Sequence, residues 1–331
     1  MACLWPFSPL GLFPLLTFLC PSFSYKMTPM SRFLGILAGV LLTWHLMGGP
    51  LAWGAGPFTY RLPQSASQVD PEAVTVVGQP QTHQVVRYEN LYQIARQYDL
   101  GFWELARYHR NLDHFFLPWD SEIVIPTQWI IPERANPPGY LINVAELRGY
   151  RFFPWKNEVY TFPIGIGVLD YKTPFGRFRV QMKAANPGWR IPKDLQWKYE
   201  RSYMPPGEDN PLGTHWLGLS HYGLHGTHAP MGVGRLVSHG CIRHYPEDIV
   251  QLFTLTPVGT PVEIIYEPVK FGFLNGRVFV EVHEDIYHKI PDMLAYALKR
   301  LRERGLGDRI NWPRFLRVVE ERNGAPVDIS P

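Results

Sequence analysis

The chain has 331 residues, a length that corresponds to about two domains and to a core that needs no disulfide staples. Hydrophobic residues make up 46% and charged residues 18%, which excludes intrinsic disorder and collagen-like repeats, while aromatics at 14% with 32 Pro and 29 Gly favour a loop-rich, mainly β fold. The formal net charge of +3 gives no basic footprint, so no nucleic-acid partner is expected.

The first 54 residues predict an N-terminal apolar extension that ends in a signal peptide. Residues 1–25 carry no charge, and a second apolar run at 33–44 has the length of a signal-peptide core but is short for a membrane span. Ala52-Trp53-Gly54 places small residues at the −3 and −1 positions of a cleavage site. We therefore expect export to the periplasm. An uncleaved membrane anchor is the alternative, and the start codon stays open.

Residues 55–81 are expected to be a linker, and residues 82–126 a small β-α-α-β domain. The pattern predicts a strand at 83–86, a helix at 90–98 capped by Asn90, a helix at 102–109 and a strand at 122–126. The last strand ends in Ile125-Pro126, and the whole unit resembles a LysM domain. The resemblance implies docking on glycans that contain N-acetylglucosamine. The alternative is a small structural cap.

A longer region, 139–268, is predicted to be the catalytic domain. Strand-like runs separated by Gly and Pro occur at 141–144, 158–162, 177–180, 215–219 and 262–266, and a helix is expected to start at Pro246. The irregular stretch 183–212 contains Trp189, Trp197, Tyr199 and Tyr203 and predicts a lid or binding loop.

The chemistry of the chain concentrates around His225 and Cys241. Cys3 and Cys20 lie in the N-terminal extension, so Cys241 is the only cysteine of the exported part and has no disulfide partner there. A cysteine nucleophile needs an imidazole to take its proton and backbone N–H groups for the oxyanion. Gly226 follows the histidine and Gly240 precedes the cysteine, so the backbone can approach a substrate carbonyl at both places.

His225-Gly226-Thr227 with Ser238-His239-Gly240-Cys241-Ile242-Arg243 resembles the signature of the L,D-transpeptidase (YkuD) family, in its ErfK/YbiS/YcfS/YnhG group. The resemblance extends to residues 162–167, 172–176, 209–213 and 257–262. His228, the order Arg235-Leu236 and His244 depart from the group and bear on substrate preference. The family fold implied is a mainly β protein with a β-sandwich catalytic domain.

The resemblance also implies the roles of the site residues. Cys241 is the nucleophile and His225 the general base, and no cofactor or metal is required. The orienting and oxyanion group is Gly240, Gly226, His239 and Ser238, in which the Gly240 and Cys241 N–H groups form the oxyanion hole and a carbonyl near Gly226 holds the imidazole. The substrate-binding group is Arg243, Thr227 and Tyr203, in which Arg243 pairs with a carboxylate.

The implied reaction uses the tetrapeptide stems of peptidoglycan. The thiolate attacks the carbonyl of the third residue, D-Ala leaves, and an amine resolves the thioester. The amine belongs either to another stem, which gives a 3-3 cross-link, or to the C-terminal lysine of a Braun-type outer-membrane lipoprotein.

Three alternatives stay open at the level of sequence. A hydrolase on the same scaffold, an L,D-carboxypeptidase or endopeptidase, would use water as the acceptor. A zinc peptidoglycan peptidase would use His225, His228, His239 and Cys241 as ligands. A non-catalytic wall-binding protein would depend on the LysM-like unit alone.

The C-terminal segment 269–331 is predicted to be a strand and helical extension. A helix at 291–304 places Leu294, Leu298 and Leu301 on one stripe and ends at Gly305, and a second begins near Asn311. We expect this helical pair to pack on the catalytic domain. The alternative is a basic face that contacts an anionic membrane or a partner protein.

Overall fold

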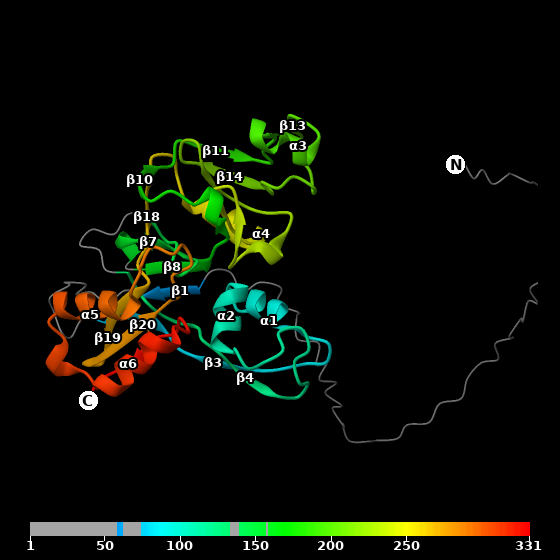
Figure 1. Ribbon diagram of the computed structural model, residues 1–331. Coiled ribbons are helices and arrows are strands. Elements are labelled where there is room, and N and C mark those ends of the chain that lie inside the picture. Colours follow the sequence, from blue (N-terminus) through cyan, green and yellow to red (C-terminus); the bar gives the residue numbers. More distant parts are fainter. Residues whose placement is uncertain (1–57, 62–73, 133–138, 157) are drawn as a thin grey trace, which may run out of the picture. The chain divides into compact units, whose positions relative to one another are not determined.

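The structure is a computed structural model that describes the backbone of residues 58–61 and residues 74–132, 139–156 and 158–331 (Figure 1). All of these belong to one compact unit, Leu51–Pro331. The predicted signal peptide and most of the predicted linker lie outside the described residues. Within the described ranges, no helix is long and apolar enough to cross a membrane.

The N-terminal unit, residues 74–132, has the predicted β-α-α-β order with one additional strand pair. Asn90 caps the first helix: its side chain accepts the N–H of Gln93 at 3.0 Å, and the Gln93 side chain accepts the N–H of Asn90 at 3.0 Å. The first strand of the predicted motif lies two residues earlier than expected. The elements are β2 (Val76–Gly78), β3 (Gln81–Gln84), α1 (Leu91–Gln97), α2 (Phe102–Tyr108), β4 (Glu122–Ile125) and β5 (Gln128–Ile130), with β3 paired to β4 and β2 to β5.

The catalytic region contains two sheets that share one apolar core. Leu217, Leu224 and Ile242 of the smaller sheet are buried with Ile142 and Phe162 of the larger one. The larger sheet has the order β1 (Phe58–Arg61), β8 (Glu158–Pro163), β7 (Arg148–Phe153), β6 (Tyr140–Asn143), β18 (Pro261–Ile265) and β10 (Gly176–Arg179). The smaller sheet has the order β11 (Met182–Ala185), β14 (His215–Gly218), β15 (Gly223–His225) and β17 (Ile242–Arg243).

Shorter elements complete this region. The predicted helix at Pro246 is confirmed as α4 (Pro246–Leu255), with proline in its first turn, where the missing N–H is not needed. Ile249 and Leu252 of α4 enter the shared core. The remaining elements are the pair β9 (Ile166–Gly167) and β16 (Leu236–Ser238), and the hairpin β12 (Trp189–Arg190) and β13 (Tyr203–Met204) with α3 (Gln196–Tyr199) between its strands.

The C-terminal extension forms a layer of its own, which corrects the prediction that its helices pack on the catalytic domain. The helices α5 (Met293–Glu303) and α6 (Trp312–Glu321) cover a sheet of β19 (Val269–Leu274), β20 (Arg277–Val282) and β21 (Val327–Asp328) (Figure 1). The hairpin β19–β20 supplies the apolar face that the helices need, and these residues form a separate core cluster. Within α5, Ala297 and Leu301 are buried but Leu294 is exposed, so the predicted stripe is displaced by part of a turn.

Ion pairs connect the N-terminal unit to the catalytic region. Arg148 of β7 is fully buried and its guanidinium donates to Glu104 of α2 at 2.7 Å. Arg96 of α1 forms an ion pair with Glu247 of α4, with 2.8 Å between nitrogen and oxygen. Arg148 is buried, whereas Arg96 and Glu247 are partly exposed. Both pairs bring opposite charges into contact and hold the two parts of the chain together.

An acidic pair lies at the same junction. Asp99 follows α1 and Asp248 belongs to the first turn of α4, and both are almost fully buried. Burial raises the pKa of Asp99 to about 7. Burial and the neighbouring charge of Asp99 also raise the pKa of Asp248 well above its usual value. Two carboxyl groups in one dry site cannot both ionise without a large penalty, so the pair holds a proton near neutral pH.

Candidate active site

The two predicted catalytic residues lie at neighbouring parallel strands: His225 is the last residue of β15, and Cys241 directly precedes β17. In β15 and β17, Leu224 pairs with Ile242 and His225 with Arg243. The same register, extended by one residue, sets Cys241 opposite Gly223. Side chains two residues apart share a face of a sheet, and so do side chains at paired positions. Cys241, His225 and Arg243 therefore occupy one face of the smaller sheet.

His225 is held in one tautomer by its own loop. Its ring is buried, and Nδ1 lies 2.6 Å from the carbonyl oxygen of Gly226. Since a carbonyl only accepts, Nδ1 carries the proton and Nε2 is left with a lone pair. Burial first, and the positive charge of Arg243 second, lower the pKa of His225 to about 3. The imidazole is neutral at physiological pH, as a general base must be.

Cys241 is a free, partly buried thiol. Burial raises its pKa, while a backbone hydrogen bond with Gly223 and the charge of Arg243 oppose that rise. Both shifts disfavour charge separation at the site, because a dry environment penalises thiolate and imidazolium alike. The resting pair is therefore a neutral thiol and a neutral imidazole.

The turn before Cys241 is braced by Ser238. The Ser238 hydroxyl donates to the carbonyl of Cys241 at 2.5 Å and accepts the N–H of Gly240 at 3.2 Å. Gly240 has a φ of +101°, and a Cβ at this position would lie 2.5 Å from the ring of Tyr222. Glycine is therefore required on both conformational and steric grounds. The Gly240 N–H predicted for the oxyanion hole is engaged with Ser238 in this arrangement.

Arg243 and His239 border the site near the lid that sequence predicted at 183–212. Arg243 is largely buried, and its Nε has no hydrogen-bond partner within the described residues. Burial lowers the pKa of Arg243, and the neighbouring phenol of Tyr199 on α3 opposes part of that lowering. His239 is exposed, its ring lies 4.5 Å from that of Tyr171, and Lys198 of α3 contributes to lowering its pKa. Side chains of α3 therefore lie close enough to Arg243 and His239 to shift the pKa of both residues.

The other two predicted substrate-binding residues differ in accessibility. Tyr203 lies on β13 and is half exposed, packed where Gly188 leaves room for its ring. Thr227 is only 4% exposed, and its hydroxyl accepts the N–H of Ala229 at 3.0 Å. That contact gives Thr227 a role in shaping the loop after His225. The contact of Thr227 with the substrate stays a prediction.

Sequence analysis missed two contacts around His225, the predicted general base. Trp216 of β14 is paired with His225, and the two rings are stacked with centroids 5.5 Å apart. Behind His225, the buried His244 places Nδ1 3.4 Å from the His225 carbonyl, and Nε2 lies 2.6 Å from the hydroxyl of Tyr140. A tryptophan on the preceding strand carries no local signal of this contact, but alternation along 215–219 would have set Trp216 on the face opposite to Leu217.

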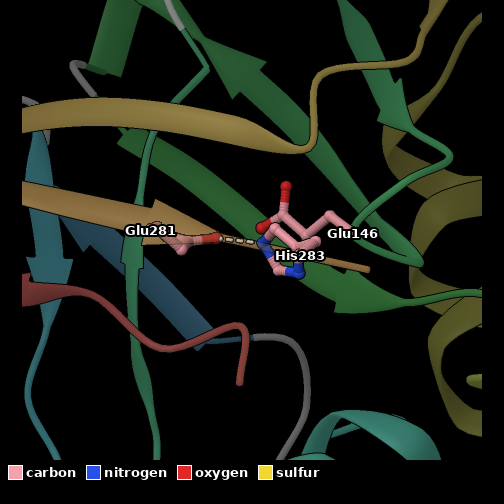
Figure 2. Close-up of side chains that lie close together, drawn as sticks. All are labelled: Glu146, Glu281 and His283. Carbon is pink, nitrogen blue, oxygen red and sulfur yellow. Dashed lines mark hydrogen bonds and ion pairs between the residues drawn. The ribbon is translucent and has the colours of Figure 1, made fainter. Parts of the chain in front are cut away.

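The ligands of the zinc alternative do not form a metal cluster. Within the described ranges, one group of three His, Cys, Asp or Glu ligand atoms lies within 4.8 Å of one another, and it contains none of the predicted zinc ligands. It consists of Glu146, Glu281 and His283, which Figure 2 shows converging, with Glu281 joined to His283.

An ammonium group already lies in that acidic cluster. The Nζ of Lys270 is 2.8 Å from Glu146 and 2.7 Å from Glu281, and His283 Nε2 is 2.6 Å from Glu281. Burial lowers the pKa of His283 to about 3, so its ring is neutral. Lys270 thus supplies the positive charge that a metal would otherwise provide, and the cluster joins the turn between β6 and β7 of the larger sheet to the C-terminal layer.

Comparison with known proteins agrees with this geometry. The sequence pattern of the YkuD family, described as L,D-transpeptidase catalytic domain, matches residues 137–264. The chain is 35% identical over 301 residues to "Probable L,D-transpeptidase YcfS" of Escherichia coli (strain K12), covering 84% of this chain and 90% of that protein.

Two further relatives match over most of their length. "Probable L,D-transpeptidase ErfK/SrfK" of Salmonella typhimurium is 34% identical over 280 residues, which cover 78% of this chain and 89% of that protein. "Probable L,D-transpeptidase YbiS" of E. coli (strain K12) is 34% identical over 243 residues, covering 70% of this chain and 77% of that protein. With its mainly β catalytic region, this chain is an enzyme of the L,D-transpeptidase family.

Proposed function

We propose that this enzyme transfers peptidoglycan stem peptides through a thioester on Cys241. The observation that carries the proposal is the parallel pairing of β15 with β17, which puts Cys241 and His225 on one face of the sheet. His225 Nε2 takes the thiol proton as sulfur attacks the carbonyl of the third stem residue. The bond to the terminal D-Ala breaks, and D-Ala leaves as an amine with the proton that His225 returns.

The second half of the reaction regenerates the thiol. An acceptor amine attacks the thioester, an amide forms, and the sulfur recovers its proton through His225. The acceptor is the side-chain amine of another stem, and the C-terminal lysine of a Braun-type lipoprotein is a second acceptor of the same chemistry. Arg243 supports the recognition step, because its buried guanidinium keeps an Nε without a protein partner in the described part and suits a stem carboxylate.

The N-terminal unit is proposed to hold the enzyme on the glycan strands of the wall. The loops beside its sheet expose Tyr88, Phe116 and Trp119, and Arg87 lies 6.0 Å from the ring of Trp119. Exposed aromatic rings stack on the apolar faces of sugars. The substrate and the predicted signal sequence together place the enzyme in the periplasm.

Product analysis of the full-length chain with a disaccharide-tetrapeptide tests the reaction. Free D-Ala together with a dimer, or with a conjugate when a lysine-terminated lipoprotein peptide is added, supports transpeptidation. Free tripeptide without either product supports the hydrolase instead. Cys241→Ala is the control, and it should give none of these products.

Sedimentation with purified peptidoglycan tests the glycan contact separately. Trp119→Ala should weaken binding, whereas Trp155→Ala should not, because Trp155 is equally exposed but belongs to the catalytic region. Equal binding by both variants and wild type would show that the aromatic loops are not the docking surface.

A further inference from the structure

The catalytic face of the smaller sheet carries an indole ring that the proposed reaction does not yet use. Trp216 of β14 is paired with His225 of β15, which in turn is paired with Arg243 of β17. These three residues form one row across the sheet. The neighbouring row is Gly218, Gly223 and Cys241, from the same register.

The indole leans from its own row onto the row that ends at Cys241. A Cβ on Gly223 would lie 2.4 Å from the indole ring, and a Cβ on Gly218 would lie 2.9 Å from its Nε1. Both contacts are far too short for real side chains, so the indole covers the two glycines. The backbone of Gly223 also forms a hydrogen bond with the Cys241 sulfur. Gly218 and Gly223, which face each other across β14 and β15, thus leave room for the flat indole ring beside the row that contains Cys241.

The same ring is stacked on the imidazole. The planes of Trp216 and His225 meet at 24° with centroids 5.5 Å apart, which is the offset stacking that aromatic rings prefer. The Gly226 carbonyl holds one edge of the imidazole, at 2.6 Å from Nδ1. The carbonyl fixes the tautomer, and the indole restricts rotation of the ring about its bond to Cβ.

We propose that Trp216 is a positioning residue for the proposed transfer reaction: its indole fixes the plane of the His225 imidazole and walls the Cys241 thioester against water. This proposal rests on the proposed function, because it gives Trp216 a part in that reaction. The position of Trp216 beside His225 follows from the sheet register alone. The charged and titratable groups that face His225 are Arg243, Cys241 and His244, and all three remain in a Trp216 variant.

Two consequences follow from an apolar wall at this place. Removal of the wall admits water to the imidazole, and hydration of the charged form raises the pKa of His225 from its low value toward that of an exposed histidine. The base is then protonated at higher pH, so the acidic limb of the rate profile moves to higher pH. Water also reaches the thioester, so hydrolysis gains on transfer to the amine.

The test compares full-length wild type with Trp216→Ala and Trp216→Phe, using a disaccharide-tetrapeptide from pH 4 to 9. We expect Trp216→Ala to lower the rate of D-Ala release about 10- to 100-fold with little change in KM. The acidic limb of its pH–rate profile should move to higher pH, and the ratio of tripeptide to dimer should increase. Trp216→Phe keeps a ring over the imidazole and should restore most of the rate. Trp155→Ala, an exposed tryptophan elsewhere, should match wild type.

A second readout does not depend on the natural substrate. The rate at which iodoacetamide alkylates Cys241, followed by intact mass across pH, reports the thiol and imidazole pair directly. Trp216→Leu, whose side chain is too small to cover the imidazole face, should shift this profile, and Trp216→Phe should not. If Trp216→Ala does not fold, the comparison of the Trp216→Leu and Trp216→Phe alkylation profiles tests the role of Trp216 instead.

The outcomes separate the two claims. Unchanged profiles in the alanine and leucine variants would overturn the role of Trp216, whether or not stems are transferred. A wild type that releases no D-Ala, but whose alkylation profile still depends on Trp216, would overturn the proposed function and leave the positioning role supported.

Discussion

Substitution of Gly240 by alanine should disable the enzyme without unfolding it. The φ of +101° at this residue is disfavoured for alanine, and adopting it costs about 1–2 kcal/mol. The added Cβ would also lie 2.5 Å from the Tyr222 ring, whereas ordinary contact begins at 3.4 Å. The turn or the ring must therefore move by about 0.9 Å, the difference of those two distances.

A displacement of that size falls directly before the nucleophile. Errors of about 1 Å in the position of a reacting atom reduce rates about 100-fold, so we expect acylation of Cys241 to slow by about that factor. The assay is the initial rate of thioester formation by intact mass, with thermal unfolding measured in parallel. The Tm should fall by only a few degrees.

Gly259 provides a matched control. It has a φ of +90°, but a Cβ there would meet nothing within 4 Å. Gly259→Ala thus carries the same backbone strain without the clash and should keep its rate. The double variant Gly240→Ala with Tyr222→Ala should recover part of the lost rate, because the clash is gone. Equal rates for Gly240→Ala and wild type would refute the steric argument.

Two more predictions concern the brace of the nucleophile turn and the acidic junction. Ser238→Ala removes hydrogen bonds to Gly240 and Cys241, so acylation should slow about 10-fold and stability should fall by about 1–2 kcal/mol; a wild-type acylation rate would argue against the brace. Because the folded-state pKa values of Asp99 and Asp248 are raised, their contribution to stability is fully present below about pH 4 and is lost as pH rises through about 7. Asp248→Asn should therefore raise stability at pH 8 by about 2 kcal/mol and lose that advantage near pH 4, which Tm measured against pH decides; a constant difference across pH would contradict the shared proton.

Local signals predicted much of the fold. Asn90 and Pro246 mark helix starts that the structure confirms, because capping and proline geometry depend on a few neighbouring residues. The strand β7 escaped detection, since Arg148 and Arg151 break its apolar pattern. Both are buried, and their partners on α2 and in the 255–256 loop come from distant parts of the chain. Pairing over such distances leaves no trace in local periodicity.

The sequence of the C-terminal layer contains a local hairpin signal that could have predicted its sheet. Asn275-Gly276 has φ values of +51° and +73° and turns β19 into β20, as expected for a two-residue hairpin with this sequence. Recognising it would have predicted a sheet for α5 and α6 to cover. At the site, the motif around Cys241 and His225 is contiguous and readable, whereas the contacts of Trp216 and His244 arise from strand register and are not.

The central claim is a covalent acyl group on Cys241, and intact-protein mass spectrometry with a disaccharide-tetrapeptide tests it most directly. The account predicts an adduct equal in mass to the substrate minus D-Ala, mapped to Cys241 by peptide analysis and absent from Cys241→Ala. Turnover of the stem by the Cys241→Ala variant, or by wild type through a metal-dependent route that a chelator abolishes, would contradict the cysteine mechanism.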